Sequence, residues 1–368
     1  MNKKVLFFLV LSFCAESSFS TPIDSLIVDT TLNANELIFQ DSIFKLNEYN
    51  KMLSESRQSY NSGLKSYNNS NFHEAIIDFT DAISIDSTFC QAYFYRAKCY
   101  EDFNGDLAIL DYRMVFSLDS TDFSALYAIA RIQSNYDPNE AISTYNLILS
   151  FSEQESKAHY EIGVLLYLQN DLEGAVVSFT NSISFKKDAR TFNDRASCYR
   201  LLGNYNLAIN DYITAIALDS DLPFIYNNLA STYRISGDSL KALAYYNLAI
   251  SKDSNYVLAY NNRGSLYIDL DDFNYALIDI EKAISLDSTY ATAYNNKAVI
   301  FHQSKKYNQA IYYFDKAISL NNDYAKAFLN RGITRQIIRD EEGACDDWLK
   351  AKKLGLNVAN KYLASDCN

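Results

Sequence analysis

Small and large apolar residues recur at a fixed interval along the chain, and this pattern predicts its elements. Between residues 189 and 356, five alanines stand 34 residues apart, each followed four positions later by a large apolar residue and three further on by a second alanine. A Gly or Ala stands twelve residues before each first alanine. Small residues at facing positions let two antiparallel helices approach closely, while the large side chain fills the space beside them. The first alanines are Ala208, Ala242, Ala276, Ala310 and Ala344.

The same pattern runs back to residue 56 and predicts nine two-helix repeats. Ala75, Ala108, Ala141 and Ala175 continue the series at intervals of 33 or 34 residues. A period of this length indicates a repeat architecture in which each unit packs on its neighbours. The third repeat matches least well, because "DPNEA" replaces the usual turn and its first helix is expected to be short. The predicted repeats span about 56–89, 90–122, 123–155, 156–188, 189–222, 223–256, 257–290, 291–324 and 325–356.

The segment Tyr226–Ser254, "YNNLASTYRISGDSLKALAYYNLAISKDS", carries the whole pattern and resembles the tetratricopeptide repeat family. The resemblance covers about residues 56–356 and implies an all-α fold, a right-handed α-solenoid of about nine helix-turn-helix units. It also implies a concave groove, lined by the first helix of each repeat, that binds a protein or an extended peptide. The repeats leave no room for a catalytic domain, so we expect no enzyme activity. Histidines His73, His159 and His302 lack metal-ligand spacing, and neither a metal site nor a cofactor is expected.

The first twenty residues have the features of a cleaved secretory signal. Lys3 and Lys4 precede an apolar run, and small residues lead up to Ser20, after which we expect cleavage. The alternative is a lipoprotein anchored through Cys14, although Phe13 is bulky where such sites take a small residue. No later apolar run approaches membrane-spanning length. The sequence therefore predicts an exported protein, periplasmic or extracellular.

Two further segments flank the repeats. Residues 21–55 form an N-terminal extension, expected as a linker over 21–33 and then an amphipathic helix. Residues 357–368 are expected to form a short helix that caps the last repeat. Of six cysteines, five remain after Cys14 is removed with the signal. Cys345 and Cys367 form a disulfide if the last helix folds back, and Cys99 and Cys198 are expected as buried thiols.

The net charge of the chain limits the kinds of macromolecule that it is expected to bind. The net charge of −12 argues against nucleic acid or an anionic membrane surface. A protein or peptide partner remains, and neither its identity nor the oligomeric state follows from the sequence.

Arginine and aspartate recur together in four repeats. The arginine directly precedes the small residue of the first helix, and the aspartate directly precedes the large residue of the second helix. We expect an ion pair that joins the two helices of each of these repeats. Desolvation offsets much of the attraction, so such a pair orients the helices more than it stabilises them. The pairs are Arg96–Asp111, Arg195–Asp211, Arg263–Asp279 and Arg331–Asp347.

Asparagines form two adjacent rows on the first helices and are the best candidates for ligand binding. An amide offers both a donor and an acceptor, which suits an extended peptide. The alternative is that these asparagines bond only between adjacent repeats. Arg200 and Arg234 lie on the same helices and are candidates to bind a carboxylate. The first row is Asn193, Asn227, Asn261 and Asn295, and the second is Asn228, Asn262, Asn296 and Asn330.

These observations favour a non-catalytic scaffold that binds a protein or peptide in the assembly or organisation of envelope or secreted complexes. Function follows from the fold only by analogy. Two alternatives stay open: a solenoid at the cell envelope that binds a glycan or small molecule, and a structural spacer that binds nothing tightly.

Overall fold

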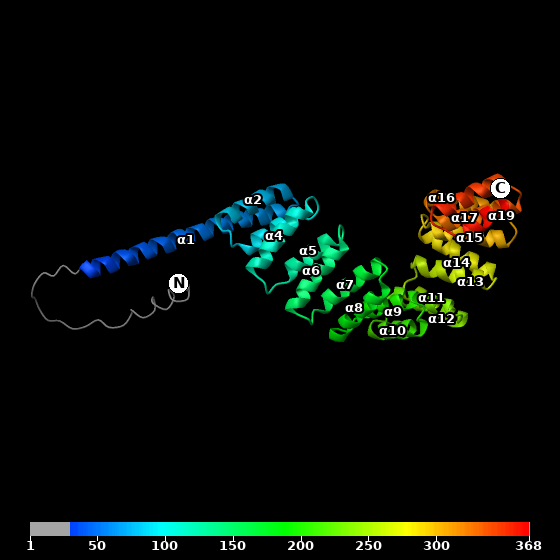
Figure 1. The fold of residues 1–368 in the computed structure, drawn as a ribbon, viewed down its shortest axis with the longest axis horizontal. Coiled ribbons are helices and arrows are strands. Elements are labelled where there is room, and N and C mark those ends of the chain that lie inside the picture. Colours follow the sequence, from blue (N-terminus) through cyan, green and yellow to red (C-terminus); the bar gives the residue numbers. More distant parts are fainter. Residues whose placement is uncertain (1–29, 368) are drawn as a thin grey trace, which may run out of the picture. The chain divides into compact units, whose positions relative to one another are not determined.

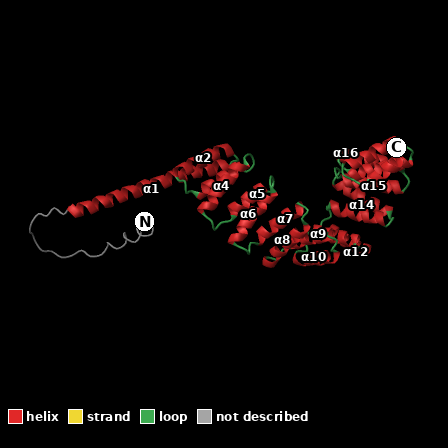
Figure 2. Cartoon of the chain, viewed as in Figure 1, coloured by secondary structure: helices red, strands yellow, loops and turns green. Residues whose placement is uncertain are grey.

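The computed structural model describes residues 30–367, and all the regular structure in this range is α-helical (Figure 2). The all-α fold class expected from the sequence is confirmed there. The expected signal over residues 1–20, with Cys14, lies outside the described residues, as do residues 21–29 of the expected linker. The helices group into two compact units, one ending at Leu118 and one beginning at Asp119.

The first unit holds a long helix followed by three shorter ones. Helix α1 runs without a break through the boundary expected at residue 55 and through the last part of the expected linker. No Gly or Pro occurs between residues 30 and 62, so nothing in the sequence ends the helix there. The later part of α1 packs against α2, while its N-terminal part projects beyond α2 (Figure 1). The helices are α1 (Thr30–Asn68), α2 (Phe72–Ile85), α3 (Cys90–Tyr100) and α4 (Gly105–Leu118).

The second unit begins with the third repeat, whose first helix, α5 (Ser124–Gln133), has only 10 residues. The residues of the unusual "DPNEA" turn cap the N-terminus of α6 (Pro138–Phe151). The Asp137 carboxylate accepts hydrogen bonds from the backbone N–H groups of Asn139 and Glu140, and Pro138 takes the first helical turn, where no N–H is needed.

The remaining helices of this unit alternate as the first and second helix of successive repeats, and each packs against the next along the chain. Up to α18, odd numbers mark first helices and even numbers second helices, and α19 follows the last repeat. The bounds are α7 (Ser156–Leu168), α8 (Leu172–Phe185), α9 (Ala189–Leu201), α10 (Tyr205–Leu218), α11 (Pro223–Ile235), α12 (Ser239–Lys252), α13 (Val257–Asp269), α14 (Phe273–Leu286), α15 (Ala291–Gln303), α16 (Tyr307–Leu320), α17 (Ala325–Ile337), α18 (Glu341–Lys353) and α19 (Ala359–Asp366).

The recurring alanines and large residues form the core between the paired helices. Ala208 and Tyr212 of the fifth repeat are fully buried, as are their counterparts in the following repeats. In the ninth repeat, a Cβ on Gly332 would lie 2.6 Å from Nε1 of Trp348. Glycine at this point of α17 therefore makes room for the largest ring in the core.

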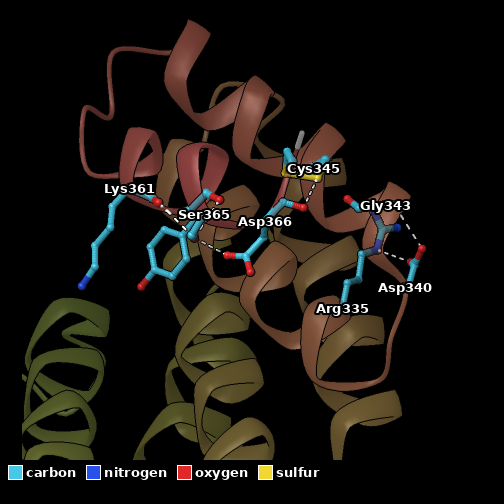
Figure 3. The surroundings of a disulfide bond; sticks show 9 residues. Arg335, Asp340, Gly343, Cys345, Lys361, Ser365 and Asp366 are labelled. Carbon is cyan, nitrogen blue, oxygen red and sulfur yellow. Dashed lines mark hydrogen bonds and ion pairs between the residues drawn. A yellow bond between two sulfur atoms is a disulfide. The ribbon is translucent and has the colours of Figure 1, made fainter.

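The C-terminal helix α19 closes the last repeat. Tyr362 stacks on the buried Trp348 with ring centroids 5.1 Å apart. A disulfide joins Cys345 of α18 to Cys367 just beyond α19, with 5.7 Å between the Cα atoms (Figure 3). Such a link stabilises mainly by constraining the unfolded chain. Over residues 30–367, every helix is too short or too polar to span a membrane.

Candidate binding surface

The four expected arginine–aspartate pairs all form, and each is a two-pronged contact between the two helices of one repeat. In every pair Nε and Nη2 of the arginine donate to the two carboxylate oxygens of the aspartate, at 2.5–2.9 Å. The aspartates are 2–8 % exposed. This fork geometry satisfies both charges, which a buried pair requires.

Each of these arginines also reaches the preceding repeat through Nη1. Arg195 donates to the Thr180 hydroxyl at 3.0 Å, and Arg263 and Arg331 donate to Asn247 and Asp315. One side chain thus holds three helices together. The arginines are occupied by the protein itself, so they belong to the architecture and not to a ligand site.

The two asparagine rows bond to each other across the repeats. Each second-row amide nitrogen donates to the side-chain oxygen of the first-row asparagine one repeat earlier, at 2.9–3.2 Å. First-row side chains are only 3–6 % exposed. The first row therefore offers no surface to a ligand, contrary to the prediction, because its side chains turn inward against the neighbouring helix. The four bonds are Asn228–Asn193, Asn262–Asn227, Asn296–Asn261 and Asn330–Asn295.

Bonds along single helices extend this set, which we call the asparagine ladder. Asn261 donates to Asn262, and Asn295 to Asn296, both at 3.3 Å. At the other end Asn193 donates to Asp194, which also accepts from the Tyr160 hydroxyl at 2.9 Å. Burial raises the pKa of Asp194, and these two hydrogen bonds oppose the rise. The ladder thus links first helices α7 to α17.

Arg234 and Arg200 occupy equivalent positions one repeat apart but have different surroundings. Nε of Arg234 donates to Oδ2 of Asp269 in the next repeat at 2.7 Å, and Nη2 donates to the Ser265 hydroxyl at 3.0 Å. Arg234 is therefore a link between repeats and not an open site, contrary to the prediction. At Arg200 the residue that corresponds to Asp269 is Ile235.

Arg200 consequently lacks an acidic neighbour. Its Nε is buried without a hydrogen-bond partner, and no carboxylate within residues 30–367 lies at ion-pairing distance. Its guanidinium lies beside the Tyr212 hydroxyl. Burial raises the pKa of Tyr212, and the Ser197 hydroxyl and the Arg200 charge oppose that rise.

Large apolar side chains stand exposed at the last residue of successive first helices, and two of them directly follow Arg200 and Arg234 in the chain. Leu168, Leu201 and Ile235, which end α7, α9 and α11, are 73, 52 and 53 % exposed. These three helices contact one another in series. We call the three residues the helix-end row. These residues were not among the predicted site residues, although the sequence has a large apolar residue at this position of three successive repeats.

Cys99 and Cys198, which the sequence predicts as buried thiols, are both buried. Burial raises the pKa of Cys99 to about 11 and that of Cys198 to about 12, so both stay protonated at neutral pH. Over residues 30–367 no three His, Cys, Asp or Glu side chains are grouped in a way that would hold a metal ion.

Comparison with known families and structures agrees with the repeats. Models described as "Tetratricopeptide repeat" match residues 225–256, 257–290 and 291–324, and one described as "TPR repeat" matches 197–237. This chain is a tetratricopeptide repeat protein. Tetratricopeptide repeats stack into extended surfaces that bind other proteins. No curated protein matches its sequence.

Two solved structures similar to this tetratricopeptide repeat protein support its fold. The APC/C hetero-tetramer Cut9–Hcn1 aligns with a TM-score of 0.56 and 14 % identity, over 85 % of this chain and 76 % of that one. A tetratricopeptide repeat protein from Parabacteroides merdae aligns with a TM-score of 0.55 and 17 % identity, over 67 % of this chain and 98 % of that one. At these identities the likeness concerns the fold alone.

Proposed function

We propose that this protein is a non-catalytic scaffold that binds a polypeptide segment of a partner protein along the exposed ends of its first helices. The observation that carries the proposal is the helix-end row, in which three large apolar side chains stand exposed at the same position of three successive repeats. A contiguous exposed apolar surface with a polar margin is typical of a protein interface. Burying each of these side chains contributes about 1.5–3 kcal/mol.

The asparagine ladder supports this proposal by fixing the spacing of the helices that carry the row. Each ladder bond between repeats joins two adjacent first helices at nearly the same height. A preformed surface loses little conformational freedom on binding, which favours affinity. The ladder thus serves binding indirectly, as a frame for the helix-end row.

The helix-end row also favours a polypeptide over a glycan. Sugar recognition uses exposed aromatic faces, whereas the rings at the main repeat position, such as Tyr212, Tyr246 and Phe314, are buried. An aliphatic row instead suits apolar side chains of a peptide or helix.

We further propose that the protein acts outside the cytoplasm, in the assembly or organisation of envelope or secreted complexes. The apolar run that follows Lys3 and Lys4 supports export. The Cys345–Cys367 disulfide is compatible with an oxidising compartment.

A capture experiment with matched variants tests the binding surface. The row variant carries Leu168→Ser, Leu201→Ser and Ile235→Ser. Its control carries Leu207→Ser, Leu240→Ser and Ile278→Ser, which alter equally exposed apolar residues on second helices. Circular dichroism establishes that both fold as the parent does.

The expected result is a partner that parent and control capture from envelope extract and that the row variant loses, with the difference reproduced by calorimetry on the purified pair. Equal capture by both variants would place binding elsewhere on the protein. If no form captures a partner, the spacer alternative is favoured.

A further inference from the structure

Arg234 lies about two helical turns beyond the ladder asparagines of α11, and its pairing with Asp269 shows how an arginine at this repeat position is satisfied by the next repeat. Asp269 ends α13 and presents Oδ2 to both Nε and Nη2 of Arg234. The Ser265 hydroxyl lies against the same guanidinium. A carboxylate and a hydroxyl from the next repeat therefore complete this arginine.

The corresponding acceptors around Arg200 are replaced or engaged elsewhere. Ser231 stands where Ser265 stands, but its hydroxyl bonds to the Tyr246 hydroxyl at 3.0 Å. Ile235 replaces the aspartate, and Nε of Arg200 is left buried without a partner in the described chain. A buried donor without a partner is unfavourable, so the site favours any acceptor that reaches it.

The surroundings indicate what kind of acceptor fits. Leu201 directly follows Arg200, Ile235 takes the repeat position of Asp269, and both are exposed aliphatic side chains. The nearest acid of the ladder, Asp194, already accepts from Asn193 and Tyr160. An anion bound here would thus be held by a fork donor between two apolar contacts, which suits a carboxylate on a polypeptide with apolar neighbours.

We infer that Arg200 is the receiving site for a carboxylate carried by the bound polypeptide, in the place that Asp269 takes on Arg234. The inference rests on the proposed function and adds to it the chemistry that the partner must bring. The carboxylate belongs either to the C-terminus of the partner or to an Asp or Glu side chain.

Arginine side-chain NMR tests the site without an identified partner. The protein is labelled on arginine, and the Nε–Hε signals are followed during titration with N-acetylglycylglycine, whose only carboxylate is a C-terminus. A second titration uses N-acetylglutamate α-amide, whose only carboxylate is a side chain. N-acetylglycylglycine amide and equal ionic strength of sodium chloride are the controls.

The Arg200 signal, assigned by its loss in Arg200→Lys, is expected to shift saturably with a carboxylate probe and not with the amide. The probe with the higher affinity identifies the source of the carboxylate. If no arginine signal responds beyond the sodium chloride control, the inference is wrong.

Variants that exchange the residues at the equivalent positions 235 and 269 make the test specific. Ile235→Asp places an internal carboxylate beside Arg200 and should weaken probe binding at least about tenfold, because a charge-assisted hydrogen bond contributes about 1.5–3 kcal/mol. Ile235→Asn introduces a neutral side chain of nearly the same shape as aspartate and should weaken probe binding less. Asp269→Ile removes the internal carboxylate from Arg234 and should create a second responding arginine.

Full binding by Ile235→Asp would overturn the inference even if the parent responds. The outcome is independent of the capture experiment. A partner captured through the helix-end row with no carboxylate response leaves the proposed function standing and removes only the role of Arg200.

Discussion

From the fifth repeat to the ninth, alternate repeats join their two helices by different chemistry. In the fifth, seventh and ninth repeats, here the aspartate repeats, the residue before the large core residue is Asp211, Asp279 or Asp347, paired with an arginine. In the sixth and eighth, here the ring repeats, that residue is a tyrosine. Tyr245 stacks on Tyr233 with centroids 5.5 Å apart and planes at 10°, and Tyr313 stacks on Phe301 at 5.3 Å and 7°.

The difference shows that the junction between the two helices of a repeat can be held by a directional ion pair or by an apolar ring contact. The fork of an aspartate repeat fixes the angle between helices but carries a desolvation penalty. A stacked ring pair buries apolar area and tolerates small shifts. The arginine fork also reaches the preceding repeat, whereas Lys297 of the eighth repeat covers the Tyr313 ring and reaches back to Glu281. The eighth repeat is therefore also linked to its neighbour, by a lysine in place of the arginine fork.

Removing one partner of a fork should give the largest effect. Asp279→Ala leaves the Arg263 guanidinium partly buried without its carboxylate, and we expect a loss of about 3–5 kcal/mol in the free energy of unfolding. Urea unfolding of the full chain measures it, and hydrogen exchange should locate the loss in α13 and α14. Glu281→Ala, an exposed acid on the same helix, should change stability by less than about 1 kcal/mol. Equal effects of the two variants would contradict the structural role of the fork.

Removing a stacked ring should have a smaller effect. Tyr245→Ala takes away a half-buried ring and its contact with Tyr233, and we expect a loss of about 1–2 kcal/mol by urea unfolding. Tyr245→Phe keeps the stack and should recover nearly all of it. If the phenylalanine variant is as unstable as the alanine variant, the hydroxyl and not the stack joins these helices.

Converting an aspartate repeat into a ring repeat should leave stability almost unchanged. Arg263→Leu with Asp279→Tyr gives the seventh repeat the residues of the sixth, where Leu229 and Tyr245 stand, and sets the new ring opposite Tyr267. Exchange of a buried ion pair for apolar groups of similar size is often neutral, so we expect a change within about 1 kcal/mol. The single Asp279→Tyr variant, which strands the arginine, should remain clearly destabilised. A double variant as unstable as that single one would mean that the two junctions are not interchangeable.

The sequence predicted the aspartate forks because both residues recur at fixed repeat positions, and a fixed period converts sequence position into spatial position. Tyr245 and Tyr313 stand 34 residues after Asp211 and Asp279 and so occupy the same repeat position, although the ring contacts were not predicted. Their partners Tyr233 and Phe301 share a repeat position too, so the signal for the stacks was present.

The asparagines could not be assigned in the same way. Successive residues on a helix point about 100° apart, so only one of two adjacent rows can face the surface. Which row does so depends on the rotation of each first helix against its neighbour, and that is set by tertiary packing. For the same reason the sequence identified Arg200 and Arg234 as equivalent candidates. Only contacts across repeats, through Asp269 or Ile235, distinguish them.

The smallest expected effect concerns the junction between a ring repeat and an aspartate repeat. Nδ1 of His302 in α15 lies 2.9 Å from the hydroxyl of Thr334 in α17, and that hydroxyl donates to the Asn330 carbonyl. The histidine must therefore donate from Nδ1. Its ring also meets the edge of Tyr307. Burial lowers the pKa of His302 below its ordinary value, so the folded state favours the neutral ring.

The pH dependence follows from this direction. Above the ordinary histidine pKa of about 6.5 the ring is neutral in both states, and its contribution is fully present. As the pH falls through that value, the unfolded chain takes up a proton first, and stability declines until the lower folded pKa is reached. We expect the stability advantage of the parent over His302→Gln to shrink between pH 7.5 and 5.5, measured by urea unfolding at each pH, with His73→Gln as the exposed control. An advantage that stays constant or grows on acidification would show that the ring is accommodated equally well when charged, and that this junction does not discriminate between the two forms.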